Sequence, residues 1–433
     1  MKTTVYEHYG ETVCEETLEN GLRILVALKP GFRKTYAMFT TRYGGSDRRF
    51  RINGEWIDTP AGVAHFLEHK MFDLPDGSNA LPVLASRGAS PNAYTSDSVT
   101  AYHFTCTDGF EENLRTLLTF VSTPYFTEES VAKEQGIIAQ EIRMTEDEPD
   151  YRCYLGLVRS LFDHHPVRDS VAGTVESIAE ITPETLYACH KVFYHPSNMV
   201  LTVVGDVDPE RIAAIAREIL PSGTQEKPER DYGTDEGVLP VKTFAEEHME
   251  IAQPLFALGA KLQYRGSGRE KLRFALLGDL SLDYLLGESS PFYTELYEKG
   301  LLTRNFGSGI DSGAESMIAE LSGESRDPLA VAEAFRQAVS ELACKGPDKA
   351  RFERCKKAMY GAQLFEWEGF RAIASSFTQG HFHGWNPMET LDVLNELTAD
   401  DVCAWLCEWL APERLALSVV WPNGNAGEEE DES

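Results

Sequence analysis

The sequence predicts an α+β protein made of two α/β halves, in each of which helices cover a β-sheet. Two observations support this fold class. Short runs rich in β-branched residues and longer amphipathic stretches occur on both sides of the middle of the chain. A polar segment rich in proline and glycine separates the two sets. With 433 residues, the chain is long enough for two or three domains that each bury a core.

The expected elements occupy comparable places in the two halves, which we interpret as distant repeats. Strands are predicted where β-branched and other apolar residues cluster, and helices where apolar residues recur with the helical period. The expected strands are 22–28, 36–42 and 199–204 in the first half, and 255–262 and 415–420 in the second. The expected helices are 112–123, 128–145, 272–287, 328–343 and 349–365.

The polar segment also sets the expected domain boundaries. Residues 1–222 are expected to form the first domain, 223–240 a linker, and 241–425 the second domain. The last residues, 426–433, are mostly acidic and are expected to form a disordered tail.

Composition and charge exclude several classes of protein. A net charge of −29 argues against binding to nucleic acid, whose phosphates would be repelled. The N-terminus has no apolar signal segment, and no run of about eighteen apolar residues occurs, so we expect neither a signal peptide nor a membrane helix. The eight cysteines form no C-x-x-C pair, which is typical of reduced thiols. We therefore expect a cytoplasmic protein with no membrane or nucleic-acid partner.

The most informative motif is His-Phe-Leu-Glu-His at positions 65–69. In a helix, His65, Glu68 and His69 share one face. Two imidazoles one turn apart can hold Zn²⁺, and the carboxylate between them can act on a metal-bound water. The alternative is a partly buried helix with two satisfied histidines and a solvated glutamate.

The residues before the motif contain signals for the start of a helix. Asp58 or Thr59 can serve as the N-cap, and Pro60 suits the first helical position. No proline follows within the motif. We therefore expect the metal helix to begin near Pro60.

A third metal ligand is expected from the helix 128–145, for which Thr127 is the predicted N-cap. Glu134 and Glu141 lie two turns apart on one face of this helix, beside apolar residues. Carboxylates on an apolar stripe are costly unless a cation or a proton neutralises them, and a bound metal would explain the pattern. If this face is only half buried, however, both acids reach water and no metal is needed.

These motifs resemble those of the insulinase/pitrilysin family of zinc peptidases, which includes the mitochondrial processing peptidases. The order H-x-x-E-H is that of the inverzincins. Glu141 follows His69 at the spacing of the third ligand in that family, and Glu134 stands at the position of its second glutamate. The similarity is dense in the first half, weak in the second, and closest to small bacterial members with two domains per chain. Further similar segments are 18–25, 90–95, 165–174 and 194–206.

The resemblance implies a role for each residue of the motifs. It implies that His65, His69 and Glu141 bind Zn²⁺. It also implies that Glu68 is the catalytic base and that Glu134 supports catalysis.

The resemblance also implies how a substrate is held. Asn92 and Ala93 would offer an edge strand to the backbone of an extended, unfolded peptide. The fold would consist of two homologous α/β sandwich halves that form half of a peptidase chamber. The expected helix 272–287 of the second half contains Asp279 and Asp283 but no histidine, so we expect this half to be a wall of the chamber.

The family also implies a partner. In the family, an arginine and a tyrosine from the second half reach the substrate, but in this chain Tyr297 stands where the arginine is expected. Arg304 could substitute if the alignment slips. We therefore expect a homologous second subunit that supplies the arginine and the tyrosine in a heterodimer, and a homodimer is less expected.

The remaining histidines of interest have no expected catalytic role. His103 alternates with apolar residues in 99–106, as on a strand beside the site. His381 and His383 could bind a metal, but no carboxylate neighbours them, and we interpret them as loop or core residues.

The expected function is that of a zinc metalloendopeptidase that hydrolyses unfolded peptides or small polypeptides, as the catalytic subunit of a two-subunit peptidase. One alternative is a catalytically weak member that serves as a scaffold or partner subunit. Another is a dedicated maturation or leader peptidase for a bioactive peptide. A closed structural zinc site is not favoured, because no cysteine lies near either motif.

Overall fold

The computed structural model describes residues 1–233 and 236–423, so the expected acidic tail 426–433 lies outside the described residues. The first half contains a seven-stranded sheet with the order β1-β2-β3-β9-β4-β8-β7, in which β7 is an edge strand. Its strands are β1 (Lys2–Tyr6), β2 (Glu11–Thr17), β3 (Arg23–Leu28), β4 (Thr35–Thr41), β7 (Ser90–Thr95), β8 (Thr100–Cys106) and β9 (Met199–Gly205).

The second half contains a five-stranded sheet with the order β11-β15-β12-β14-β13. Its strands are β11 (Phe244–Met249), β12 (Leu255–Lys261), β13 (Gly307–Ser312), β14 (Met317–Glu324) and β15 (Ala416–Pro422). A small third sheet consists of β5 (Arg49–Ile52), β6 (Glu55–Asp58) and β10 (Glu229–Arg230).

The two large sheets share one topology. In the first, β3 pairs in parallel with β9, and β9, β4, β8 and β7 follow as antiparallel neighbours. In the second, β11 pairs in parallel with β15, and β15, β12, β14 and β13 follow in the same antiparallel manner. The predicted fold class of two α/β halves is therefore confirmed, and the shared strand order is that expected of repeats.

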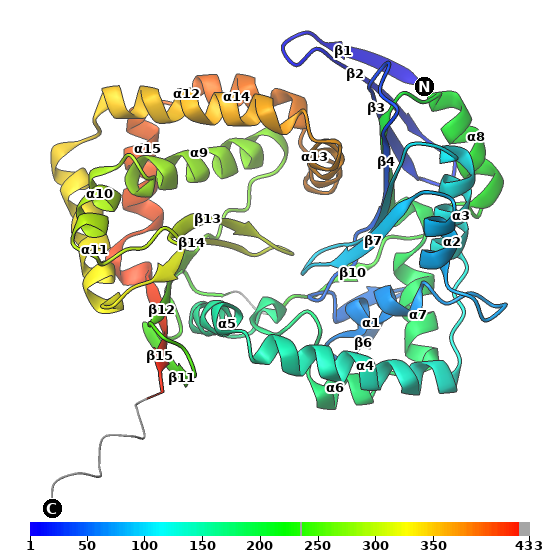
Figure 1. Cartoon of the computed structure of the whole chain (residues 1–433), viewed down its shortest axis with the longest axis horizontal. Coiled ribbons are helices and arrows are strands. Elements are labelled where there is room, and N and C mark those ends of the chain that lie inside the picture. The colour runs from blue at the N-terminus through cyan, green and yellow to red at the C-terminus, as the bar shows by residue number, and fades with distance from the viewer. Residues whose placement is uncertain (234–235, 424–433) are drawn as a thin grey trace, which may run out of the picture.

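Helices cover both sheets (Figure 1). Those before the linker are α1 (Val63–Lys70), α2 (Ala80–Ser86), α3 (Phe110–Ser122), α4 (Glu128–Glu146), α5 (Pro149–Leu161), α6 (Val175–Ala179), α7 (Pro183–Phe193) and α8 (Pro209–Ile219). Those after it are α9 (Gly268–Leu286), α10 (Pro291–Glu298), α11 (Pro328–Lys345), α12 (Lys349–Glu366), α13 (Phe370–His383), α14 (Thr390–Glu396) and α15 (Ala399–Trp409). Short 3₁₀ turns are η1 (Pro166–Arg168), η2 (Pro196–Asn198), η3 (Pro387–Glu389) and η4 (Pro412–Arg414). No helix among these residues has the length and apolar composition that a membrane span requires.

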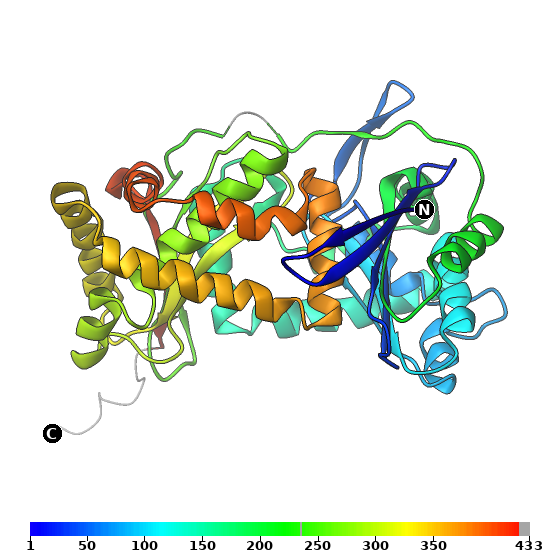
Figure 2. The same cartoon turned by 90° about the horizontal axis from the view of Figure 1, so that it is seen from above.

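Each half contributes one helix to the sheet of the other half. Helix α13 packs on β4 and β9 of the first sheet, and α5 packs on β11, β12 and β15 of the second. Figure 2 shows the orange α13 beside the blue strands of the first sheet. Both faces of the sheets are therefore buried. In β4, for example, Ala37 and Phe39 enter the outer core, and the alternate residues Tyr36 and Met38 pack towards α13.

The expected linker is attached to the domains on both sides of it. Its strand β10 pairs with β5, and Arg230 forms an ion pair of 2.8 Å with Asp47, whose side chain is almost fully buried. The Glu236 carboxylate accepts hydrogen bonds from three backbone N–H groups, those of residues 163–165. Burial raises the pKa of Glu236, but these hydrogen bonds and the Lys261 charge outweigh it and lower the pKa to about 2. Residues 229–230 and 236 of the polar segment are thus attached to the folded halves.

Candidate metal centre

Helix α1 presents the H-x-x-E-H motif on one side and an apolar surface on the other. Phe66 and Leu67 have no exposed surface and pack into the first core, so the opposite side of the helix faces outwards. The two imidazole rings of His65 and His69 lie there with their centroids 4.6 Å apart. The helical spacing of the motif therefore places both histidine rings on one side of α1, as predicted.

The start of this helix differs from the prediction. Helix α1 begins at Val63, and its N-cap is Gly62 in a left-handed conformation with φ of 94°, with no side-chain cap. A Cβ atom at Gly62 would lie 2.5 Å from the Ala172 carbonyl oxygen, so only glycine fits this close approach. Asp58 ends strand β6 instead, and Pro60 lies before the helix.

Helix α4 brings Glu141 to the two histidines. His65 Nε2 lies 3.3 Å from Glu141 Oε1, and His69 Nε2 lies 3.6 Å from Glu141 Oε2. A tetrahedral Zn²⁺ with bonds of roughly 2.0–2.1 Å separates its ligand atoms by about 3.3 Å. One atom from each of the three residues lies within 4.8 Å of the other two, and these residues are the only such group in the described part of the chain. The donor set and spacing therefore fit a zinc ion.

Glu134 is not one of these three residues but contacts one of them, His69. Its Oε1 atom is 3.0 Å from His69 Nδ1, so the carboxylate accepts the Nδ1–H hydrogen and leaves Nε2 free to face Glu141. A carboxylate in this position fixes the tautomer and the orientation of a metal-binding histidine. The equivalent nitrogen of His65, Nδ1, is buried and has no hydrogen-bond partner among the described residues.

The cap predicted for this helix is confirmed. The Thr127 hydroxyl accepts a hydrogen bond from the Ser130 backbone N–H, and the Ser130 hydroxyl accepts one from the Thr127 N–H. This capping box begins α4 two turns before Glu134.

The carboxylates affect the charge state of His69. Burial lowers the pKa of His69, but the hydrogen bond to Glu134 and the charges of Glu68 and Glu141 together raise it above the ordinary value. The hydrogen bond with His65 lowers the pKa of Glu141, although partial burial opposes this effect. A centre with more carboxylates than imidazoles thus attracts positive charge, whether protons or a metal ion.

Glu68, the carboxylate of the motif, is buried, with 8% of its surface exposed. Its Oε2 atom accepts a hydrogen bond of 2.6 Å from the Thr95 hydroxyl at the end of β7. Thr95 had no predicted role. A signal for this role was present in the sequence, because Thr95 is the last residue of the segment 90–95, which contains the expected edge-strand residues Asn92 and Ala93.

The predicted substrate strand lies beside the motif helix. Strand β7 packs against α1 and, within residues 1–233 and 236–423, pairs with β8 alone, so its other edge is not paired with another described strand. Asn92 and Ala93 are opposite His103 and Tyr102 of β8. The Asn92 side chain accepts a hydrogen bond of 2.9 Å from the Ala93 backbone N–H.

His103 lies on a strand next to β7, as predicted. Neither of its ring nitrogens has a hydrogen-bond partner among the described residues. Burial, followed by the charge of Arg371, lowers the pKa of His103 to about 4. The ring is therefore a neutral part of the sheet surface.

The residues considered for substrate contacts in the second half are not part of this centre. Tyr297 stacks on Tyr293 in α10, and Arg304 is exposed between α10 and β13. Figure 1 places α10 and α1 in opposite halves of the molecule. Neither residue is thus brought to the motif helix of its own chain.

Comparisons with known proteins assign the family. Residues 54–175 match the family model described as Insulinase (Peptidase family M16), and residues 180–359 match the one described as Peptidase M16 inactive domain. A Bacillus subtilis (strain 168) protein named uncharacterized zinc protease YmfH is 38% identical and aligns with 98% of this chain and 99% of its own length. A Mycobacterium leprae protein, also named uncharacterized zinc protease, is 27% identical, with 95% and 92% covered.

Solved structures agree with this assignment. An M16-like peptidase from Alicyclobacillus acidocaldarius is 34% identical, with a TM-score of 0.91, and the match covers 95% of this chain and 99% of that chain. A protease from Helicobacter pylori is 18% identical with a TM-score of 0.79, and shares the fold. Similarity of this extent, along nearly the whole chain, shows that the chain belongs to the insulinase family, peptidase family M16.

Proposed function

We propose that this chain is a zinc metalloendopeptidase that hydrolyses extended, unfolded peptides. The proposed ligands are His65, His69 and Glu141, and the proposed base is Glu68. The observation that carries the proposal is the arrangement of two imidazoles and one carboxylate within 4.8 Å of one another, beside the enclosed Glu68. Three protein ligands with one open position are typical of catalytic zinc sites.

Each residue of the centre has a distinct part in this proposal. When bound, zinc supplies a Lewis acid that polarises the peptide carbonyl and increases the acidity of water. Glu68, oriented by Thr95, takes the proton of the attacking water and gives it to the leaving amine. Glu134 acts as a positioning residue, because it holds the His69 ring through Nδ1.

The free edge of β7 supports the proposed class of substrate. A peptide that adds a strand to this edge is recognised mainly through its backbone, and only an unfolded segment offers its backbone in that way. Asn92 and Ala93 would form this contact. Loose sequence specificity follows, because backbone hydrogen bonds are common to all residues.

We further propose a cytoplasmic two-subunit enzyme. The cysteines are all free, which supports a reducing compartment. A second subunit is supported by the position of Tyr297 in α10 and of Arg304 after it, in the half opposite α1, because neither residue can then serve as an oxyanion donor beside α1 of its own chain. A homologous partner in a heterodimer would supply the arginine and the tyrosine.

The proposal is tested with metal analysis and peptide hydrolysis on the same preparations. The purified wild type should hold about one zinc ion per chain, and His65→Ala and His69→Ala should lose it. Glu141→Gln should bind zinc more weakly than the wild type. Glu68→Gln should keep the zinc but lose peptidase activity by orders of magnitude, because an amide cannot accept the proton. Wild-type hydrolysis by Glu68→Gln would exclude Glu68 as the base. Full zinc in His69→Ala would exclude the ligand set.

A further inference from the structure

A cavity of about 650 Å³ lies between the two halves. One wall comes from the first half, with Tyr94 and Ser96 at the end of β7, and the other comes from α9, β13 and α13. Between Tyr94 and Ser96 stands Thr95, which donates its hydrogen bond to Glu68. The neighbours of Thr95 in the chain thus place part of this cavity beside the end of β7.

At one end of the cavity, two cations form no ion pair with a carboxylate within the described residues. The Lys271 ammonium group of α9 lies 3.1 Å from His383 Nδ1 at the end of α13, and a histidine nitrogen that accepts from a lysine is neutral. Arg42, which follows β4, lines the same cavity and takes part in no side-chain hydrogen bond or ion pair within residues 1–233 and 236–423. Burial lowers the pKa of Lys271, and the Arg42 charge lowers it further against the effect of Glu315.

The histidine is held in a fixed orientation between these cations. Its ring stacks on Trp385, with centroids 4.8 Å apart and planes at 20°. Because Nδ1 accepts from Lys271, the ring proton is on Nε2, which can donate to a ligand. Burial and the charges of Lys271 and Arg42 lower the pKa of His383 to about 4, and no carboxylate opposes them. The ring thus remains a neutral donor at neutral pH.

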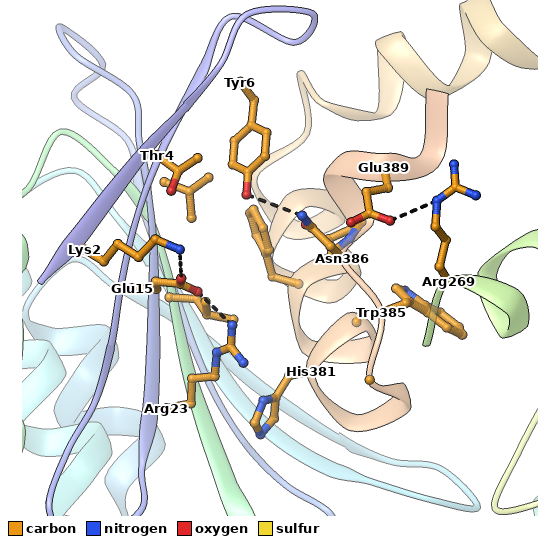
Figure 3. Close-up of a pocket in the computed structure, with 16 residues that line it drawn as sticks. Lys2, Thr4, Tyr6, Glu15, Arg23, Arg269, His381, Trp385, Asn386 and Glu389 are labelled. Carbon is orange, nitrogen blue, oxygen red and sulfur yellow. Dashed lines mark hydrogen bonds and ion pairs between the residues drawn. The ribbon is translucent and has the colours of Figure 1, made fainter. Parts of the chain in front are cut away.

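A neighbouring cavity has ordinary charge pairing. It lies between the N-terminal hairpin and α13, and Figure 3 shows its charged side chains in contact with one another. Lys2 and Arg23 both pair with Glu15, and Arg269 pairs with Glu389. Lys271, by contrast, bonds to a histidine and not to a carboxylate.

Four acidic residues line the larger cavity (Asp279, Asp311, Glu315 and Glu366), and of these only Glu315 affects the pKa of Lys271. Asp279 lies eight residues after Lys271 on α9, which is about 12 Å along a helix. The charge of Glu366 acts on Asp279 and not on Lys271. Glu315 is near enough to act on Lys271, but the two form no ion pair in the described part of the chain.

We propose that Lys271, Arg42 and His383 form a carboxylate-binding subsite of the peptide chamber. The subsite rests on the proposed peptidase function and adds a preference to it: a favoured substrate carries a carboxylate at a fixed spacing from the bond that is cleaved. That carboxylate belongs either to the C-terminus of the peptide or to an aspartate or glutamate side chain. Two charged donors and one neutral donor suit a carboxylate, whose two oxygens accept several hydrogen bonds.

Peptide binding tests the subsite and distinguishes the two sources. Equilibrium binding to the Glu68→Gln variant is measured by fluorescence anisotropy with two peptide pairs, one with a free or an amidated C-terminus and one with an internal glutamate or glutamine. The carboxylate member of one pair should bind about tenfold more tightly or better. The pair that shows the difference identifies the source.

Variants connect this preference to the named residues. Lys271→Gln and, separately, the surface variant Arg42→Gln should reduce the ratio of the two dissociation constants towards one. The matched control Lys345→Gln removes the same charge from an exposed lysine that pairs with Glu341, and should leave the ratio unchanged. Equal binding of both members of both pairs would overturn the subsite, as would an unchanged ratio in both Lys271→Gln and Arg42→Gln.

A second measurement does not depend on peptides or on zinc. Acetic anhydride labelling of Lys271 in the wild-type protein, followed by mass spectrometry, is compared in succinate and in uncharged succinamide, with Lys345 as the internal reference. Succinate should slow the labelling of Lys271 several-fold relative to Lys345. Equal labelling in the two solutions would overturn the subsite. Protection of Lys271 together with no peptide hydrolysis by the wild type would instead reject the peptidase function alone.

Discussion

Glu68 depends on a hydrogen-bond donor that comes from a different element. The Thr95 hydroxyl, at the end of the edge strand, donates to the carboxylate at 2.6 Å. A carboxylate of which only 8% is exposed has few conformations available, and the donor selects among those of Glu68, the proposed base. The strand that is proposed to hold the substrate therefore also orients the base, which links substrate position to proton transfer.

Substitution of Thr95 tests this link. Thr95→Val keeps the shape of the side chain but removes the donor, and a hydrogen bond to a charged group is worth about 1.5–3 kcal/mol. We expect peptidase kcat to fall about tenfold or more while zinc content is unchanged. Thr95→Ser, which retains the hydroxyl, should recover most of the activity. Unchanged turnover in Thr95→Val would show that the donor does not orient the base.

At the scale of elements, helix α1 is placed by a glycine. Gly62 has a positive φ and approaches the Ala172 carbonyl, so the segment that follows η1 determines where the motif helix begins. Because His65 and His69 are the third and seventh residues of this helix, a shift of its first turn displaces both imidazoles. The metal centre thus depends on a contact with residues more than a hundred positions later in the chain.

Replacement of this glycine should weaken both the fold and the metal site. Gly62→Ala introduces a Cβ atom at 2.5 Å from a carbonyl oxygen in a left-handed conformation, and we expect a loss of at least about 1–3 kcal/mol of stability together with weaker zinc binding. Gly54→Ala is the matched control, since Gly54 also has a positive φ but its Cβ would meet nothing within 4 Å. Thermal unfolding and zinc titration compare the two. Similar losses in both variants would assign the effect to backbone strain alone.

At the scale of the whole molecule, carboxylates gather where the halves meet. Asp97, in the turn between β7 and β8, lies against Gly313 of the second half. The Tyr154 hydroxyl of α5 donates to Asp311 of β13. Burial, followed by the charge of Asp311, raises the pKa of Asp97 to about 7, although a hydrogen bond from Ser46 opposes this. Burial and Asp311 also raise the pKa of Glu320 to about 7.

These groups make the stability of the joined halves depend on pH. The unfolded chain releases the protons of such carboxyls at about pH 4, whereas the folded protein retains them until about pH 7. The stability that these carboxyl groups contribute to the folded protein is therefore complete below pH 4 and is lost as the pH rises to 7. Asparagine does not ionise, so Asp97→Asn should remove part of this loss of stability at high pH. The variant should therefore have a higher melting temperature than the wild type at pH 8 and a smaller difference at pH 5. A rise of equal size at both pH values would contradict the assignment.

The second subunit is also a question at this scale. Because the residues considered for the oxyanion lie in the half opposite α1, this chain alone should hydrolyse peptides slowly, and donors at an oxyanion commonly contribute a factor of about 10²–10³. Co-expression with a homologous chain that carries the arginine and the tyrosine should restore this factor. Peptide turnover and molar mass, measured on both preparations, show whether the second subunit is needed for full activity. Equal turnover by the isolated chain would make the partner unnecessary.

The sequence by itself determined the local features of this protein. The spacing within positions 65–69 placed His65 and His69 on one helical face, and the capping box at Thr127 set the start of α4. The predicted helices 328–343 and 349–365 also agree with α11 and α12 to within two residues at each end. Such features depend on residues within a few positions of each other, so periodicity and capping chemistry are sufficient to predict them.

Only the tertiary structure decided which elements meet. Helices α5 and α13 were not among the predicted helices, and no local pattern shows that each covers the sheet of the other half. The same limit explains the wrong cap at Asp58 or Thr59, because the Ala172 contact that requires Gly62 is distant in sequence. It also explains why His383 was interpreted as a loop or core residue, since Lys271 lies 112 positions away from it. These contacts form between distant segments only when the whole chain packs, and local sequence patterns carry no record of them.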